Sequence, residues 1–142
     1  MSESSPVHEI PEEDCWAMLH AEEFGRLAFH LLDEVHITPL NYAVDAHRKI
    51  IFRTAEGSKL SGILGNGDVA FEIDELIEDA AASVVVRGRA VELAGDAAIA
   101  VDQLRLRPWV RTVKNHVISI KVTEISGRFF MLSKPWLHMV PS

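Results

Sequence analysis

Short apolar runs separated by tight polar turns are the feature that most limits how this chain can fold. The runs are rich in valine, isoleucine and phenylalanine and largely alternate in the period-two pattern of β-strands. They lie at residues 26–32, 35–44, 50–54, 68–74, 83–93 and 116–132, the last with a break at Ser126-Gly127. Strands joined by tight turns pair antiparallel, whereas parallel strands need long crossovers. The pattern therefore favours an antiparallel barrel over a doubly wound sheet.

Three short helices are expected among these strands. One begins after Pro11, where three acidic residues suit the first helical turn, and we expect it to stop at Gly25. The other two cover residues 58–64 and 96–106, and residues 75–82 are expected to form an acidic loop. The predicted organisation is a flexible tail at 1–10, one barrel domain at 11–133 and a C-terminal tail at 134–142.

The charge balance limits the kinds of molecule that the protein could bind. The 142 residues include 21 acidic and 14 basic ones, which gives a net charge of −7. This argues against binding nucleic acid or anionic membrane, because both require clustered cations. No apolar run reaches the roughly 18 residues of a membrane span. The single cysteine, Cys15, is expected to be buried and inert, and we expect a cytoplasmic protein.

The segment KIIFRTAEGSKLSGIL, residues 49–64, carries the main candidate site. A strand ends at Arg53 and Thr54, and a helix is expected to begin with Ser58 as its N-cap, followed by Lys59. Two cations, two hydroxyls and the free N–H groups of a helix start could together hold one phosphate. The glycine spacing of a Walker loop is absent. A solvated turn with ordinary caps and surface charges is the alternative.

Five segments in order resemble a known family: GRLAF at 25–29, PLNYAVD at 39–45, IIFRTAEGSKL at 50–60, VAFEID at 69–74 and SVVVRGRAVEL at 83–93. They are similar to the FMN-binding split barrels related to pyridoxamine 5'-phosphate oxidase, and in particular to the branch that includes the nitroimidazole-resistance proteins. The resemblance implies a six-stranded antiparallel split barrel with short helices. It also implies a homodimer with two FMN sites at its interface.

The resemblance assigns residues to the flavin. It implies that the phosphate is bound by Arg53, Thr54, Ser58 and Lys59, and that the isoalloxazine ring lies along the main chain of Pro39, Leu40, Asn41 and Tyr42. Ser83 matches a position that helps to close the site. Trp109 is equally compatible with a core or dimer contact and with stacking near the ring. Ala43 stands where the true oxidases have a second lysine, and their C-terminal motif cannot be mapped here, so oxidation of pyridoxamine phosphate is not expected.

The function expected from this resemblance is an FMN-dependent oxidoreductase. It would pass electrons from a nicotinamide donor to a small electrophile such as a nitroaromatic or a quinone. No side chain is identified as catalytic. The alternatives are a reductase that binds the deazaflavin F420 and a non-catalytic protein that binds flavin or haem. The seven histidines lack the spacing of a metal site, so no metal is expected.

Overall fold

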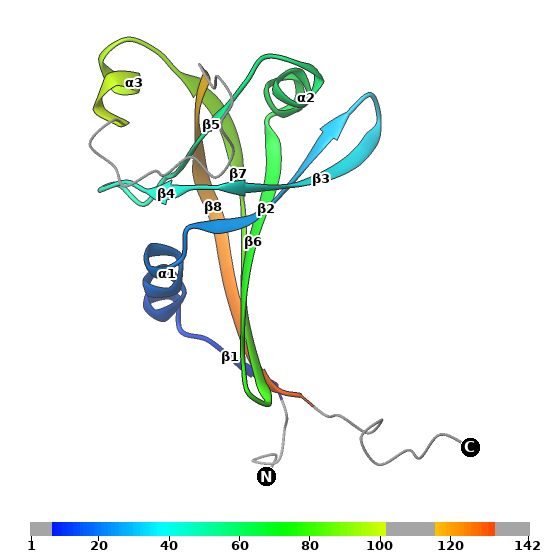
Figure 1. The fold of residues 1–142 in the computed structure, drawn as a ribbon, viewed down its shortest axis with the longest axis vertical. Coiled ribbons are helices and arrows are strands. Elements are labelled where there is room, and N and C mark those ends of the chain that lie inside the picture. Colours follow the sequence, from blue (N-terminus) through cyan, green and yellow to red (C-terminus); the bar gives the residue numbers. More distant parts are fainter. Residues whose placement is uncertain (1–6, 102–115, 133–142) are drawn as a thin grey trace.

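The computed structural model describes residues 7–101 and 116–132, which form a curled antiparallel sheet with three helices (Figure 1). The strands are β1 (Val7–Glu9), β2 (Phe24–Leu31), β3 (Glu34–Asn41), β4 (Ala43–Val44), β5 (Ile50–Thr54), β6 (Asp68–Ile77), β7 (Ala80–Leu93) and β8 (His116–Met131). The helices are α1 (Glu12–Ala21), α2 (Ser58–Asn66) and α3 (Asp96–Ala100). The predicted mainly-β split barrel is confirmed.

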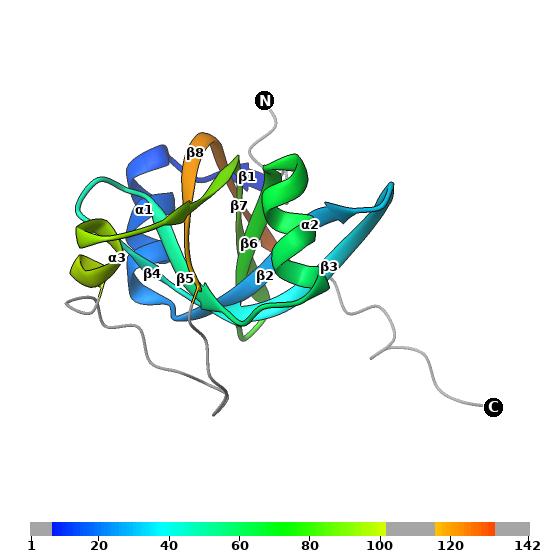
Figure 2. The ribbon, with the colours of Figure 1, turned by 90° about the horizontal axis from the view of Figure 1, so that it is seen from above.

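The sheet closes through one continuous piece of chain. Its strand order is β3-β2-β6-β7-β8-β5-β4, with β1 added beside β8. The two edge strands, β3 and β4, follow each other in sequence with only Tyr42 between them. Residues 34–44 therefore join both edges and curl the sheet into a barrel, which Figure 2 shows from above with α2 over one end. In the described residues the sheet has eight strands rather than six, because the predicted run at 35–44 is divided into β3 and β4 and the three-residue β1 is added.

Three strands extend beyond the barrel as an arm, which we define as residues 72–85 and 126–131 (Figure 1). The prediction of an acidic loop at 75–82 was wrong. There β6 and β7 continue to a tight turn at Glu78-Asp79, and the half-buried Glu75 pairs with Ala82 without interrupting the ladder. The predicted break at Ser126-Gly127 was also wrong, since β8 runs through it. Gly127 lets the strand approach α1 closely, where an added Cβ would meet Cys15 and Ile10.

The core fills the barrel and extends under α1. Large side chains from six strands meet inside, including Leu27, Leu40, Phe52, Phe71, Val84 and Ile118. Helix α1 adds Cys15, Trp16 and Leu19, and burial raises the pKa of the Cys15 thiol, as expected for an inert cysteine. A second, smaller cluster of Ile51, Val101 and Val117 lies on the outer side of β5 and β8, beside α3. The chain therefore covers both faces of β5 and β8 at this end.

Gly25 does not end the first helix, as the sequence had predicted. Helix α1 ends at Ala21, and Gly25 lies in β2 opposite Leu40. A Cβ at this position would stand 2.8 Å from the carbonyl oxygen of Glu72 and 3.0 Å from a methyl group of Ile73. Glycine is required here because β2 and β6 approach closely, not because a helix terminates.

We therefore expect Gly25→Ala to destabilise the protein by about 1–3 kcal/mol, the usual cost of overpacking a filled site. Gly65→Ala is the matched control, because nothing lies within 4 Å of the position that its added methyl group would take, and alanine suits the interior of α2. The control should be about 0.5–1 kcal/mol more stable than the parent. Urea denaturation measures both. Equal stability of the two variants would contradict the proposed close contact.

Candidate functional site

The side chains of Arg53 and Thr54, at the end of β5, lie on opposite faces of the sheet. Along β5, Phe52 lies in the barrel core and Ile51 lies in the outer cluster, so successive side chains alternate between the two faces. Thr54 therefore points inward and is only 1 % exposed, with its hydroxyl directed at the carbonyl oxygen of Ala55 at 3.4 Å. Arg53 is half-buried on the outer side. Of the predicted phosphate ligands, Thr54 is the one whose side chain lies in the interior.

The N-terminus of α2 is formed by glycine rather than by the predicted serine cap. Gly57 is the N-cap with φ of 144°, a conformation that favours glycine, and Ser58 is the first helical residue. Among the described residues, no side chain caps this helix. The first N–H groups of an α-helix have no intrahelical acceptor and carry the positive end of its dipole. Together with Arg53, Ser58 and Lys59 they form a group that we call the cradle.

The stretch predicted to contact a flavin ring, residues 39–42, leads into β4, which pairs with the strand that carries Arg53. Ala43 pairs with Ile51 and Val44 with Ile50, whereas Asn41 pairs with Phe24 of β2 and lies outside the β4–β5 pairing. Leu40 belongs to the barrel core, whereas Pro39 is exposed on the other face of β3. Asn41 shares the outward face with Pro39 and is largely covered. The two parts of the predicted site are thus connected through the pairing of β4 with β5.

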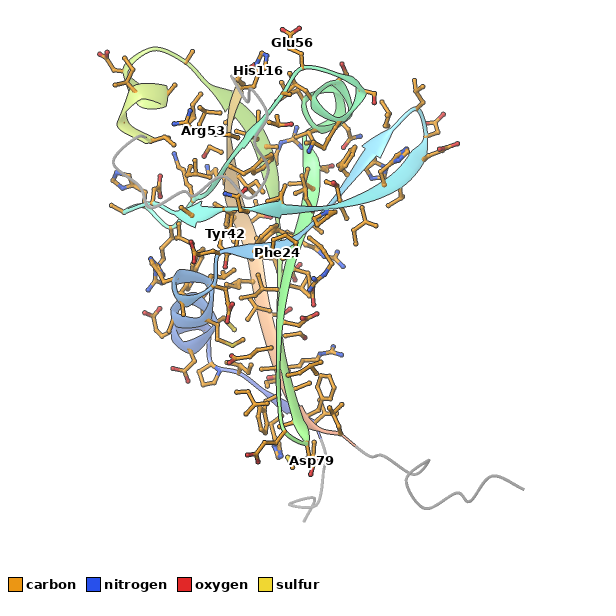
Figure 3. The ribbon with its side chains drawn as sticks, viewed as in Figure 1. Phe24, Tyr42, Arg53, Glu56, Asp79 and His116 are labelled. Atoms are coloured by element: carbon orange, nitrogen blue, oxygen red, sulfur yellow. The ribbon has the colours of Figure 1, made fainter. Side chains whose placement is uncertain are left out.

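Tyr42 has a structural role in this arrangement. Its N–H donates a hydrogen bond to the carbonyl oxygen of Glu23 at 2.9 Å, and its hydroxyl donates to that of Leu19 at 2.7 Å. The ring packs edge-on against Phe71, and burial raises the pKa of the phenol. Figure 3 shows Tyr42 directed toward α1, away from Arg53. Both donors of Tyr42 therefore form hydrogen bonds within the protein. Any contact with a flavin ring would be made by its neighbours in the chain.

Ser83 lies far from the cradle within one chain. Arg53 pairs with Val117, which in turn pairs with Leu93 on β7, ten residues from Ser83. At the rise of a β-strand this separation is about 33 Å. Ser83 lines a different hollow, of about 440 Å³, on the arm together with Val85, Arg87, Glu124, Ser126, Gly127 and Arg128. The predicted residues thus form two groups in one chain. Trp109 lies outside the described residues.

His116 was not singled out by the sequence, yet it borders the cradle. It pairs with Thr54 across β5 and β8. Its Nδ1 is 2.6 Å from a carboxylate oxygen of Glu92, and its Nε2 is 3.2 Å from one of Glu56, in the turn before α2. Both carboxylates raise the pKa of His116, with Glu92 the larger cause. A lone histidine at the start of a strand gives no spacing signal, since only the pairing of distant strands assembles this cluster.

Comparison with known proteins identifies the family. The sequence profile of the family described as pyridoxamine 5'-phosphate oxidase matches residues 11–129. This chain belongs to that family.

Three relatives show how far the similarity reaches. The structure of the FAD binding protein from Mycobacterium smegmatis is 34% identical with a TM-score of 0.78, over 89% of this chain and 100% of that one. The uncharacterised protein Rv3129 of Mycobacterium tuberculosis is 39% identical over 84 residues, which is 58% of this chain and 76% of the relative. A structure described as a 5-nitroimidazole antibiotic resistance protein, from Bacteroides thetaiotaomicron, is 12% identical over 87% of each chain, with a TM-score of 0.72. The last of these shows the shared fold alone.

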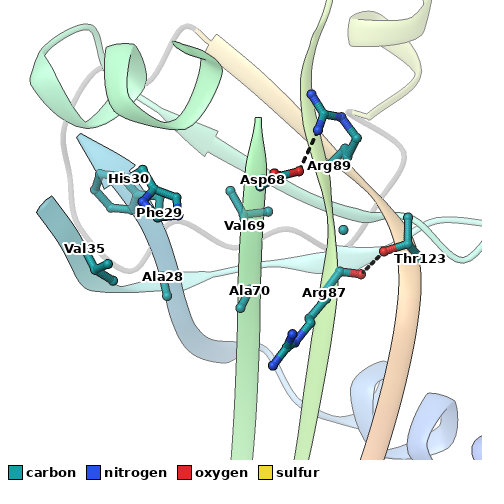
Figure 4. A pocket seen from close by; sticks show the side chains of 11 residues that line it. Ala28, Phe29, His30, Val35, Asp68, Val69, Ala70, Arg87, Arg89 and Thr123 are labelled. Carbon is teal, nitrogen blue, oxygen red and sulfur yellow. Dashed lines mark hydrogen bonds and ion pairs between the residues drawn. The ribbon is translucent and has the colours of Figure 1, made fainter. Parts of the chain in front are cut away.

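The pyridoxamine 5'-phosphate oxidase fold of this chain has a further hollow, of about 520 Å³, beside β2, β6 and β7 (Figure 4). Small residues, Ala28, Ala70 and Gly88, contribute to its lining. Arg89 pairs with the carboxylate of Asp68 at 2.6 Å. The hollow contains none of the residues of the cradle, so it adds no group to that site.

Two negative findings apply to the described parts of this family member, residues 7–101 and 116–132. In them, no group of three histidine, cysteine, aspartate or glutamate side chains is arranged to hold a metal ion. None of their helices combines the length and apolar character needed to cross a membrane.

Proposed function

We propose that this protein binds a flavin by its phosphate at the cradle and works as a flavin-dependent oxidoreductase. One observation carries the proposal: the N-terminus of α2, which lacks a side-chain cap among the described residues, belongs to a short segment that also carries two cationic residues, Arg53 and Lys59, in a chain whose net charge is −7. A local excess of positive charge in an acidic chain is suited to a specific anion. Membership of the pyridoxamine 5'-phosphate oxidase family supports a flavin phosphate as that anion.

The cradle fits a phosphate group on chemical grounds. Backbone N–H groups at a helix start point along the helix axis toward an anion, and the dipole favours negative charge there. The guanidinium and ammonium groups of Arg53 and Lys59 can add charge-assisted hydrogen bonds, and the exposed Ser58 hydroxyl can add a neutral one. Gly57 has no Cβ, and its positive φ turns the chain sharply into α2. A phosphate monoester such as that of FMN presents enough acceptor oxygens for all of these donors.

The ring of the flavin would lie along the outer face of β3. Asn41 comes two residues before Ala43, the partner of Ile51 on β5, and Pro39 is exposed two residues further back on the same face. A flavin site needs such a combination of an anion-binding end and a flat surface with few polar groups. When bound, a flavin supplies hydride and electron transfer, which the protein's own side chains cannot perform. The protein's part is to bind the phosphate, orient the ring and set the local charge.

The proposed reaction is the reduction of a small electrophile, such as a nitroaromatic or a quinone, with electrons from a nicotinamide donor. The buried free thiol of Cys15 suits the reducing cytoplasm, where nicotinamide donors are abundant. A protein that binds flavin without turnover is the second candidate. FAD is a second candidate cofactor, because a relative of 34% identity is described as FAD binding.

We further propose that a second copy of this chain completes each site. Ser83 is too far from the cradle of its own chain to contact the same flavin, so the partner's Ser83 would do so. Large apolar side chains exposed on the arm support this arrangement; they are Leu76, Ile77, Val85, Phe129 and Met131. Exposed apolar patches of this kind mark surfaces that associate. Each dimer would then hold two equivalent sites.

The first experiment is to identify the cofactor of the purified protein. A flavin absorption spectrum is expected, and acid release followed by chromatography and mass spectrometry should yield FMN. Recovery of FAD would keep the flavin proposal and change the cofactor. A colourless protein that takes up neither FMN nor FAD would contradict the proposal, and F420 and haem would then be titrated. Oxidation of NADH or NADPH with a nitroaromatic or quinone acceptor separates the enzyme from the non-catalytic binding protein.

A further inference from the structure

His116 occupies a position between the sheet and the turn that carries the cradle. It is the first residue of β8, and its cross-strand partner Thr54 is the last residue of β5. Two charged groups of the described chain face its imidazole, Glu92 from β7 and Glu56 from the turn before α2. Figure 3 shows His116 and Glu56 together at the end of the barrel that α2 covers. The imidazole thus links a fixed strand to the turn.

The geometry is satisfied best by an imidazole that carries two protons. Nδ1 lies 2.6 Å from Glu92 and Nε2 lies 3.2 Å from Glu56, so each ring nitrogen faces a carboxylate oxygen. A neutral imidazole has only one N–H, and its other nitrogen would present a lone pair to a carboxylate. The doubly protonated imidazolium donates on both sides. The same two carboxylates raise the pKa of His116, which agrees with this state.

Glu56 is an acidic residue close to the cradle, and its negative charge would oppose the binding of an anion there. It lies two residues before Ser58, and its side chain is largely exposed. An uncompensated carboxylate at this position would repel a phosphate dianion. The contact with His116 fixes this carboxylate on the side of β8 and cancels one negative charge. Glu92 in turn anchors the imidazole to β7, which is paired with β8 along its length.

We propose that His116 is a positioning residue for the flavin phosphate. Its imidazolium holds Glu56 against the sheet and keeps the turn at 55–57 clear of the cradle. When His116 loses its proton, this contact is lost and flavin binding weakens. The inference rests on the proposed flavin site. It goes beyond that function because it assigns a pH-dependent role to three residues that do not themselves touch the flavin.

The direction of the pH effect follows from the raised pKa. An ordinary histidine has a pKa of about 6.5, so His116 keeps its proton to a higher pH than that. The contact is complete below the ordinary value and is lost as the pH rises through the value in the folded protein. The second pKa of a phosphate monoester is about 6, so FMN is essentially a dianion from pH 7 upward. A loss of affinity above pH 7 therefore reports the protein and not the ligand.

The binding test compares the apoprotein with H116Q, E56Q and the double variant. FMN and riboflavin are titrated at pH 7 and pH 9 by quenching of flavin fluorescence. We expect H116Q to bind FMN about tenfold more weakly than wild type at pH 7, the effect of one released charge near a dianion. The wild type should approach that weaker affinity at pH 9, whereas riboflavin binding should change little. E56Q should bind at least as tightly as wild type at both pH values.

The double variant distinguishes positioning from simple structural damage. If His116 acts through Glu56, then H116Q/E56Q should recover the affinity of E56Q. A double variant as weak as H116Q would overturn the inference, and so would H116Q binding as tightly as wild type.

A second measurement does not depend on flavin. In NMR titrations of the apoprotein, the amide signals of Gly57, Ser58 and Lys59 should shift with the same midpoint as the His116 ring. In E56Q this shared titration should disappear and the pKa of His116 should fall. If the wild type binds no flavin, the proposed function fails, and this measurement still decides whether His116 controls the turn. Amide signals that ignore the titration of His116 would overturn the inference.

Discussion

Replacing Arg53 and Lys59 together with alanine should weaken FMN binding by about two to four orders of magnitude. Each hydrogen bond to a charged group contributes about 1.5–3 kcal/mol, and a tenfold change in affinity corresponds to about 1.4 kcal/mol. Two such bonds account for the expected loss. The fold should survive, because Arg53 is half-buried on the outer side of β5 and Lys59 lies in the first turn of α2.

The measurement is a fluorescence titration of the apoprotein with FMN, and riboflavin serves as the internal control. Riboflavin lacks the phosphate, so its affinity should change little in the double variant. A matched protein control is R89A/K121A, which also removes one arginine and one lysine, from paired positions on β7 and β8. Arg89 lies near Asn66 at the opposite end of α2 from the cradle. An equal loss for FMN and riboflavin would argue against a phosphate site at these residues.

The sequence predicted the elements around the cradle because their signals are local. The strand predicted at 50–54 is β5, and the alternation of side chains along a strand puts Arg53 and Thr54 on opposite faces. The start of α2 was one residue from its expected place. Ser58 is a good capping residue, but Gly57 adopts the positive φ that the turn requires, so the glycine takes the cap position.

Other features depend on tertiary pairing, which the sequence does not display. Residues 75–82 are acidic enough to suggest a loop, yet the pairing of β6 with β7 continues to Ile77 and Ala80, so only Glu78 and Asp79 form a turn. Gly25 suggested a helix stop, and only the approach of β6 explains why a glycine stands there. The cluster of His116, Glu56 and Glu92 joins residues up to 60 positions apart, so no local motif could reveal it.

Introducing a charge beside Ser83 should abolish both dimer formation and flavin retention. Val85→Glu places a carboxylate on the arm, on the face that covers the partner's flavin in the proposed dimer. Val85 is 36% exposed in the single chain, so the substitution should be tolerated by the isolated fold. At a buried interface the same carboxylate would lose its hydration without gaining a partner, which costs several kcal/mol. The dissociation constant of the dimer should therefore rise by at least about a hundredfold.

Leu32→Glu is the matched control for this change. It also replaces an exposed aliphatic side chain with a carboxylate, but at the turn between β2 and β3, where Leu32 is 88% exposed. Sedimentation velocity at micromolar concentration should show the control as a dimer with flavin and Val85→Glu as a monomer without it. Circular dichroism should show the same β-sheet content in both.

This experiment tests two proposals separately: that the chain forms a dimer, and that the partner's Ser83 contacts the flavin. A Val85→Glu monomer that retains flavin with full affinity would show that one chain forms the whole site, and Ser83 would then have no part in it. A wild-type protein that is itself monomeric would leave the apolar surface of the arm without its proposed partner. Loss of dimer and flavin together is the result that a site shared between two chains requires, because about 33 Å separates Ser83 from the cradle along the strands of one chain.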